Sequence, residues 1–166
     1  TVWAAGHNEK YFVIKYYQQG VWRDIPLPKN WSESIRAFTF NVSDNNGETY
    51  VWLGNKNQIL RYSETNKEWS NWTLKRNNLS ISINSIVEGS NQTFICTTNG
   101  IFEVQKNSGN NEIVYSELNK KFSEEKNILI VKEKDGVLYV LGHDWLGEID
   151  NNTFKLLSNS INISQV

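Results

Sequence analysis

Two histidines and one aspartate come closest in this sequence to a recognisable chemical arrangement. His7 and His143 each follow a glycine at the end of a predicted strand, and Asp144 comes directly after His143. A protein-bound metal ion needs three or four convergent ligands, so these residues are a thin donor set. The sequence also contains no H-E-x-x-H or C-x-x-C motif. We therefore expect exposed or hydrogen-bonded histidines, with no metal and no other cofactor.

The single cysteine, Cys96, lies in the middle of a predicted strand. A lone cysteine has no partner for a disulfide within the chain, and in a strand it packs as a small hydrophobic residue. We expect Cys96 to be buried and to have no catalytic or metal-binding role.

Carboxylates decide whether a hydrolase is a reasonable alternative. Glycoside hydrolysis needs two carboxyl groups about 5–10 Å apart in one pocket. Asp144 is the carboxylate that we place in a ligand-facing loop, whereas Glu33, Glu124 and Glu125 fall in predicted connecting loops. A solvated surface charge is the simpler interpretation of each. A glycoside-hydrolase-like enzyme is therefore kept as the alternative to a non-catalytic protein.

The segment Ser43–Tyr50 resembles the Asp-box of sialidases, Ser-x-Asp-x-Gly-x-Thr-Trp. Asn45 stands where the aspartate is expected, and Tyr50 replaces the tryptophan. The Asp-box is a structural hairpin even in sialidases, and Asn46-Gly47 is a typical tight-turn sequence. The segment therefore predicts a hairpin and no catalytic site.

Composition excludes some functions. The chain has 166 residues, 39% of them hydrophobic, and a net charge of −1. That charge gives no electrostatic basis for binding nucleic acid or an acidic membrane surface. No run of about 18 apolar residues occurs to span a bilayer. The N-terminal Thr1–Trp3 already reads as a strand with no signal peptide before it, so we expect a mature product or a piece of a longer chain.

Spacing predicts the fold. Similar units of two short strands around a polar turn contain Trp3, Trp52, Phe94 and Tyr139 at matching positions, which lie 49, 42 and 45 residues apart. A repeat of about 40–50 residues made only of short strands is typical of β-propeller blades with four strands, A to D. We predict a single all-β domain, 1–166, as a propeller or propeller fragment of about four antiparallel blades. The predicted blades are 1–25 (plus 160–166), 35–73, 83–115 and 128–157.

The two ends of the chain are informative together. The first unit has no A strand, whereas Ser160–Val166 alternates in the way of a half-buried A strand. Either this tail pairs with Thr1–Ala5 and closes a four-bladed ring, or both ends are cuts through a larger ring. Closure would remove an open sheet edge.

In a propeller, the B–C and D–A loops share one rim, where ligands usually bind. Trp31 and Trp145 lie in loops and are the candidates for stacking on a sugar ring, although burial against a neighbouring blade is the ordinary alternative. The asparagines of these loops supply amide hydrogen bonds. The candidate ligand-binding residues on this rim are His7, Asn8, Trp31, Asn55, Lys56, Thr98, Asn99, His143, Asp144 and Trp145.

The segments Asn78–Phe102 and Val51–Tyr62 resemble the two-component regulator propeller repeat, which forms periplasmic sensor domains of hybrid histidine kinases in gut Bacteroidetes. The first unit, Val2–Trp22, is closer to the blades of glucosyl-hydrolase-like surface lipoproteins. Cys96 and Gln58 replace glycines of the repeat. The resemblance implies a propeller with a sensor role, located in the periplasm or at the cell surface.

These observations together predict a non-catalytic, extracytoplasmic recognition or sensor module. The expected partner is an oligosaccharide or a protein, and nucleic acid is not expected. A purely structural protein–protein interaction propeller is the other alternative. That role predicts a homodimer through open-edge strands or the outer D strands near Trp69 and Trp72.

Overall fold

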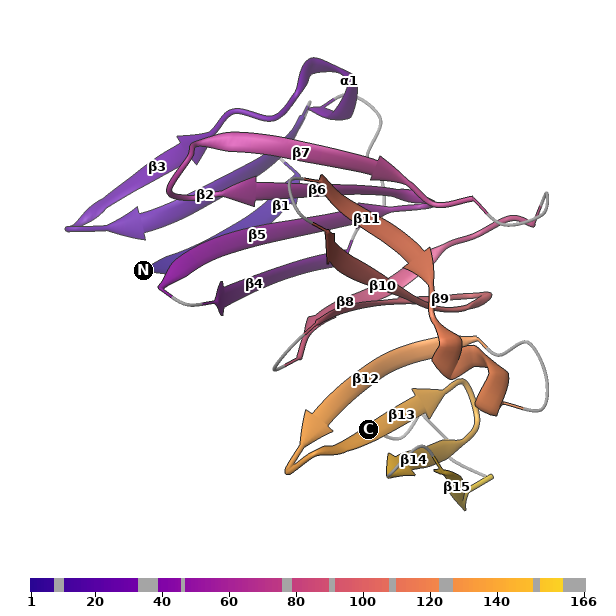
Figure 1. Ribbon diagram of the computed structural model, residues 1–166. Coiled ribbons are helices and arrows are strands. Elements are labelled where there is room, and N and C mark those ends of the chain that lie inside the picture. The colour runs from indigo at the N-terminus through magenta and orange to yellow at the C-terminus, as the bar shows by residue number, and fades with distance from the viewer. Residues whose placement is uncertain are drawn as a thin grey trace.

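The computed structural model describes residues 1–7, 11–32, 39–45, 47–75, 79–89, 92–107, 110–122, 127–150 and 153–159. Within these ranges the chain forms fifteen strands, arranged in four antiparallel sheets that follow one another along the sequence (Figure 1). The prediction of an all-β fold built from four short blades is confirmed. We refer to the sheets as blades one to four in chain order.

Each blade is a meander in which neighbouring strands are consecutive in the chain. The first blade contains β1 (Val2–His7), β2 (Phe12–Gln18) and β3 (Val21–Ile25). The second contains β4 (Thr39–Asn45), β5 (Glu48–Asn55), β6 (Gln58–Ser63) and β7 (Glu68–Thr73). The third contains β8 (Ile83–Glu88), β9 (Thr93–Thr97), β10 (Gly100–Asn107) and β11 (Asn110–Tyr115). The fourth contains β12 (Ile128–Lys134), β13 (Val137–Gly142), β14 (Leu146–Asp150) and β15 (Thr153–Ser158).

Helical structure in the described residues is limited to two short segments between blades. They are α1 (Lys29–Ser32) and the 3-10 helix η1 (Glu117–Lys121). Ser116 caps η1, because its side-chain oxygen accepts a hydrogen bond from the Leu118 amide. No helix in the described ranges is long and apolar enough to cross a membrane.

The predicted tight turns explain why the strands pair in register. Asp135 and Gly136 join β12 to β13 with φ values of 52° and 78°. Positive φ at both central residues is the conformation that matches the twist of a two-residue hairpin. The β4–β5 hairpin is also present, with Asn45 opposite Glu48 and the Thr49 hydroxyl donating to Asp44 Oδ1 at 2.5 Å. The hairpin predicted from the Asp-box resemblance is therefore confirmed.

The blades pack face to face, and in blades two, three and four the first strands lie against the neighbouring blade. β8 contacts β4 and β5 on one side, and β12 contacts β8 and β9 on the other. Three apolar cores fill the spaces between successive blades. Gly54 shows how close the second and third blades lie, because a Cβ there would be 2.8 Å from Ile83 Cγ2. A larger residue at that place would push the blades apart.

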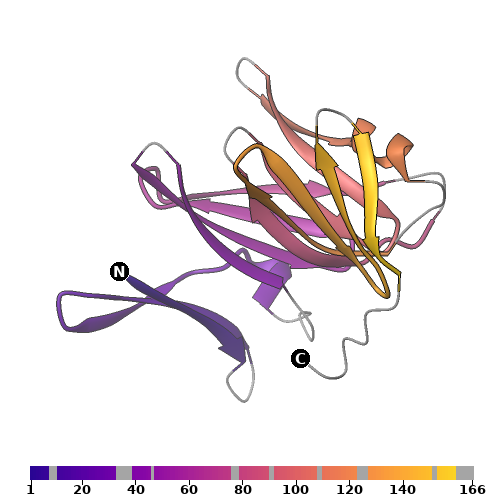
Figure 2. The ribbon, with the colours of Figure 1, turned by 90° about the horizontal axis from the view of Figure 1, so that it is seen from below.

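The described blades form an open row. The first and fourth blades lie at opposite ends, at the top and the bottom of Figure 1, and Figure 2 looks along the row from the side of the fourth blade. Within the described residues β1 pairs with β2 only. The predicted strand Ser160–Val166 lies outside the described residues, so its pairing with Thr1–Ala5 stays a prediction.

Candidate functional site

The B–C turns and the D–A connections share one rim of the molecule, and this rim is the candidate ligand-binding site. In the second blade, the β5–β6 turn is fixed to the connection that leads to the third blade. Asn57 exchanges two hydrogen bonds with Leu74: its carbonyl accepts from the Leu74 amide at 2.7 Å, and its Nδ2 donates to the Leu74 carbonyl at 3.1 Å. The Lys56 carbonyl accepts from the Ile83 amide at 2.9 Å. The turn is therefore rigid, while the Lys56 side chain is exposed and Asn55 is half-buried.

The β9–β10 turn of the third blade is held by the same connection. Thr98 and Ser82 bond each other twice, through Thr98 N to the Ser82 carbonyl at 2.9 Å and Ser82 N to Thr98 Oγ1 at 3.0 Å. Asn99 Nδ2 donates to the Ser80 carbonyl at 2.5 Å. Thr98 and Asn99 are half-buried, and these polar groups stabilise the connection. The side chains of Thr98 and Asn99 therefore hold the rim together and are poorly placed to contact a ligand.

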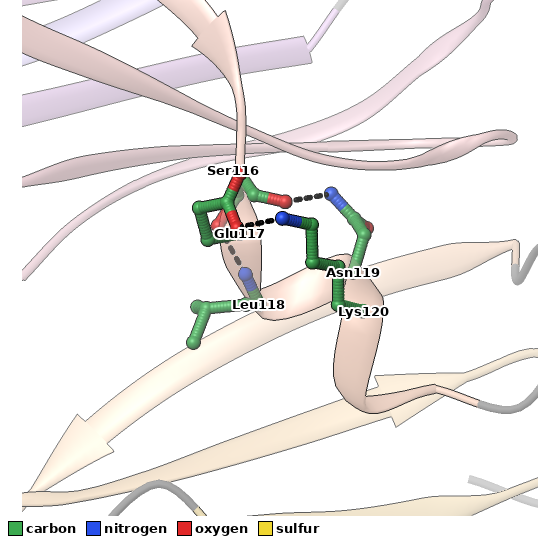
Figure 3. Close-up of polar contacts among 5 residues, drawn as sticks. All are labelled: Ser116, Glu117, Leu118, Asn119 and Lys120. Carbon is green, nitrogen blue, oxygen red and sulfur yellow. Dashed lines mark hydrogen bonds and ion pairs between the residues drawn. The ribbon is translucent and has the colours of Figure 1, made fainter.

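A residue that the sequence analysis did not single out, Asn119, fixes the same turn from the other side. Its Oδ1 accepts from the Ile101 amide at 2.8 Å, and its Nδ2 donates to the Ile101 carbonyl at 2.7 Å and the Ser116 carbonyl at 2.8 Å. Figure 3 shows Asn119 in η1 beside Ser116. Gly100 makes room for it: φ is +105°, and a Cβ would lie 2.4 Å from Asn119 Oδ1. An asparagine just after a Ser-Glu helix start was the available signal.

The β13–β14 turn of the fourth blade presents the exposed side chains of His143 and Asp144. Trp145, by contrast, folds under the turn and is only 7% exposed. Its ring contacts those of Phe122 and Phe154, with centroid distances of 5.7 and 5.8 Å. The indole also lies so close to Gly142 that a Cβ there would be 2.0 Å from Nε1. The side chain belongs to the core between blades three and four.

Trp31 is buried as well. It lies in α1, is 4% exposed, and belongs to the core between the first and second blades. Burial, the ordinary alternative for both Trp31 and Trp145, is therefore what the structure shows. Neither indole presents a face on which a sugar ring could stack.

The remaining predicted residues divide between described and undescribed parts. His7 ends β1 opposite Phe12, but its side chain lies outside what the structure describes, as does all of Asn8. Glu33, Glu124 and Glu125, the carboxylates of the hydrolase alternative, also lie outside it. The structure thus places five of the predicted residues on turns of one rim: Lys56, Thr98, Asn99, His143 and Asp144. The side chains of Lys56, His143 and Asp144 are exposed there, and those of Thr98 and Asn99 are half-buried.

Neither a metal-binding cluster nor a reactive thiol occurs in the described residues. No group of three His, Cys, Asp or Glu side chains lies close enough there to hold a metal ion. Cys96 is fully buried, which confirms its expected packing role, and burial raises the pKa of its thiol to about 11. A thiol with that pKa stays protonated near neutral pH and is a poor nucleophile.

Comparisons with known proteins agree with the fold. No protein-family model matches the chain, and no curated protein does. Among solved structures, the chain is similar to the AfRom2 CNH domain, with a TM-score of 0.54 and 10% sequence identity. The match covers 93% of this chain and 56% of that one, so this chain spans little more than half the length of that structure. The similarity supports a β-propeller-like arrangement of sheets, and at this identity it shows the fold alone.

Proposed function

We propose that this chain is a non-catalytic, extracytoplasmic recognition module of a sensor receptor, and that it binds a polypeptide ligand through the polar rim of its B–C turns. The observation that carries the proposal is the construction of that rim. Two neighbouring turns are tied by backbone and amide hydrogen bonds to the connections between blades. These hydrogen bonds give the rim a rigid support.

The chemistry of the rim favours a polypeptide over a glycan. On the B–C turns that the structure describes, those of blades two, three and four, the exposed side chains are those of Lys56, His143 and Asp144, which offer a cation, an imidazole and a carboxylate. Such groups pair with the charges and backbone amides of a peptide. Glycan recognition was the finer prediction. It relied on the loop asparagines for hydrogen bonds and on Trp31 and Trp145 for stacking, and both indoles are buried. The extracytoplasmic location is supported by the resemblance to periplasmic sensor propellers alone.

A displayed library of random peptides is a suitable probe. We expect peptides that bind the wild-type chain to lose about tenfold or more in affinity when Lys56, His143 and Asp144 are all replaced by alanine. The matched control carries Thr65→Ala, in the β6–β7 turn, and Lys134→Ala, at the end of β12; both positions are exposed and lie on the opposite rim. The control should bind like wild type.

A glycan array run on the same three proteins distinguishes the two ligand classes. Glycan binding that is lost in the Lys56/His143/Asp144 variant would replace the polypeptide proposal by a glycan-binding one. Peptides that bind the rim variant as tightly as wild type would show that the rim is not the recognition surface.

A further inference from the structure

Equivalent residues of the repeat show which face of each blade meets the next one. Trp3, Trp52 and Phe94 occupy the same position in successive blades, opposite Tyr16, Arg61 and Glu103 on the neighbouring strand. Trp3 packs into the core between blades one and two, Trp52 into that between two and three, and Phe94 into that between three and four. This position therefore always faces the following blade.

Tyr139 has the same position in the fourth blade, opposite Glu148. It therefore points to where a following blade would pack. Ile130, Leu141 and Leu146 lie side by side in register on the same face. Ile130 is 44% exposed, the others are half-buried, and none belongs to the apolar cores of the described residues. The fourth blade thus carries a following-side face without a described neighbour.

The first blade carries the complementary feature on its outer side. Val2, Tyr17 and Trp22 form a row across its three strands. Their exposed fractions are 60%, 39% and 49%. Large side chains at neighbouring positions of one sheet face make an apolar patch of the kind that marks an interaction surface.

The second blade shows what covers such a row. Val51, Tyr62 and Trp69 occupy the same three repeat positions in it. The two aromatic pairs have nearly the same geometry: the Tyr62–Trp69 centroids are 5.1 Å apart at 47°, and the Tyr17–Trp22 centroids are 5.4 Å apart at 50°. Val51 and Tyr62 are buried by the following-side face of the first blade. Trp69 Nε1 also donates to the Pro26 carbonyl beyond β3 at 2.9 Å.

We propose that the outer face of the first blade binds the outer face of the fourth blade of a second copy of this chain. The Val2-Tyr17-Trp22 row is built to receive a following-side blade face, and the Tyr139 face is such a face. Head-to-tail contacts of this kind close into a ring when the rotation between copies allows it. Two copies of four blades then form one ring of eight, in which each outer face is covered. The pairing does not depend on the rim ligand.

Charge does not oppose this pairing. On the first blade Lys15 and Asp24 neutralise each other, with their charged atoms 3.1 Å apart. On the fourth blade Lys155 and Glu148 also neutralise each other, with their charged atoms 3.2 Å apart. Lys132, opposite Tyr139, then adds a positive charge to this face. The contact differs from the predicted homodimer through outer D strands, because it uses blade faces and leaves Trp72 in its core position.

Light scattering coupled to size-exclusion chromatography tests the proposal on the 166-residue chain. Wild type is expected to elute as a pair, at twice its mass of 19.2 kDa. Trp22→Glu and Ile130→Glu each place a charge in a different face, and each should weaken the pair by about tenfold or more. Leu79→Glu is the matched control, because Leu79 is 42% exposed but lies in the connection before β8.

Mixing the variants tests the head-to-tail geometry. A pair of one Trp22→Glu chain and one Ile130→Glu chain has one doubly altered junction and one unaltered junction, so the mixture should recover dimer that neither variant forms alone. Monomeric wild type would overturn the proposal and favour covering by blades of a longer polypeptide. A dimer broken by Trp22→Glu but not by Ile130→Glu would also overturn it, because that pattern requires first blade on first blade.

Discussion

The interface between blades two and three contains a half-buried charge, whereas the core between blades three and four is apolar. In the former, the Arg61 guanidinium lies over three rings, with its Cζ 4.7 Å from the centroid of Tyr50, 5.4 Å from Trp52 and 5.5 Å from Trp72. In the latter, Cys96 is buried among Ile101, Val131 and Val140. The same repeat thus builds two chemically different blade contacts.

Acidic groups explain how a guanidinium is accommodated there. Burial lowers the pKa of Arg61, while Tyr50, Glu48 and Glu88 act in the opposite direction. Hydrogen bonds from the Tyr50 hydroxyl at 2.5 Å and the Ser63 hydroxyl at 2.7 Å lower the pKa of Glu48 and keep it ionised. Flat aromatic faces add cation–π attraction. The position of a residue in the repeat therefore determines whether its side chain faces the next blade. The acidic and aromatic groups around it determine whether a charged side chain can be accommodated there.

The largest expected effect comes from removing the ring that lies in the centre of the charged interface. Trp52 is 1% exposed, packs at 6.2 Å centroid distance on Trp72, and lies beside Arg61. Trp52→Ala should lower the free energy of unfolding by about 3–5 kcal/mol, measured by urea denaturation. Leu79→Ala, an exposed control, should change it by less than about 0.5 kcal/mol. A Trp52→Ala loss below about 1 kcal/mol would show that the second interface does not depend on this ring.

A double-mutant cycle between Arg61 and Glu88 tests whether the charges are coupled. Arg61→Met keeps apolar bulk but leaves the acidic groups uncompensated, so we expect a loss of about 2–3 kcal/mol. Glu88→Gln should lower the free energy of unfolding less in the Arg61→Met variant than in wild type, and the difference should be about 1 kcal/mol or more. Lys120→Met, which breaks only an exposed ion pair with Glu117, should have little effect. Additive losses would mean that Arg61 acts through packing alone.

Much of the fold was predictable from the sequence. β-Branched and aromatic runs, separated by turns such as Asp135-Gly136, fix strand positions because each turn allows few registers. The strands of blades two, three and four span 39–73, 83–115 and 128–158. The residues at the matching positions, Trp3, Trp52 and Phe94, all lie in the cores between blades.

The candidate site was less predictable, for a physical reason. Sequence places a side chain in a loop but does not say whether the loop lies over a core. Trp145 follows two exposed residues, yet Gly142 leaves the space into which its ring packs. Asn119 and Arg61 were missed because their roles depend on partners on other strands or connections, which only the assembled sheets bring together.

Asn119 tests how far the interface between blades three and four depends on its connection. Asn119→Ala removes three hydrogen bonds and leaves the Ile101 amide and carbonyl without those partners. Because the site is half-buried, we expect a loss of about 2 kcal/mol in unfolding free energy. Lys120→Ala, the exposed neighbouring position, should be nearly neutral. Equal effects of the two variants would show that water replaces the Asn119 bonds without cost.

The smallest expected effect is a pH dependence from the apolar interface. Burial raises the pKa of the Cys96 thiol to about 11, whereas an unfolded thiol ionises near about 8.5–9. Above that lower value the unfolded chain releases a proton that the folded chain retains, so stability falls as pH rises toward 11. Between about pH 8 and about pH 10 the loss from Cys96 should be about 1.5 kcal/mol, measured by urea denaturation at each pH.

Cys96→Ala separates this effect from the tyrosines of the other interface. The pKa of Tyr50 is also raised, first by burial and then by Glu48, so its ionisation destabilises the fold at high pH with the same sign. The alanine variant loses packing at every pH, which lowers its stability by a constant amount. Its slope between about pH 8 and about pH 10 should be shallower than that of wild type, because only the thiol has been removed. If the two proteins show the same slope of unfolding free energy against pH, the core around Cys96 opens to water before the thiol ionises. The contact between blades three and four would then be looser than that between blades two and three.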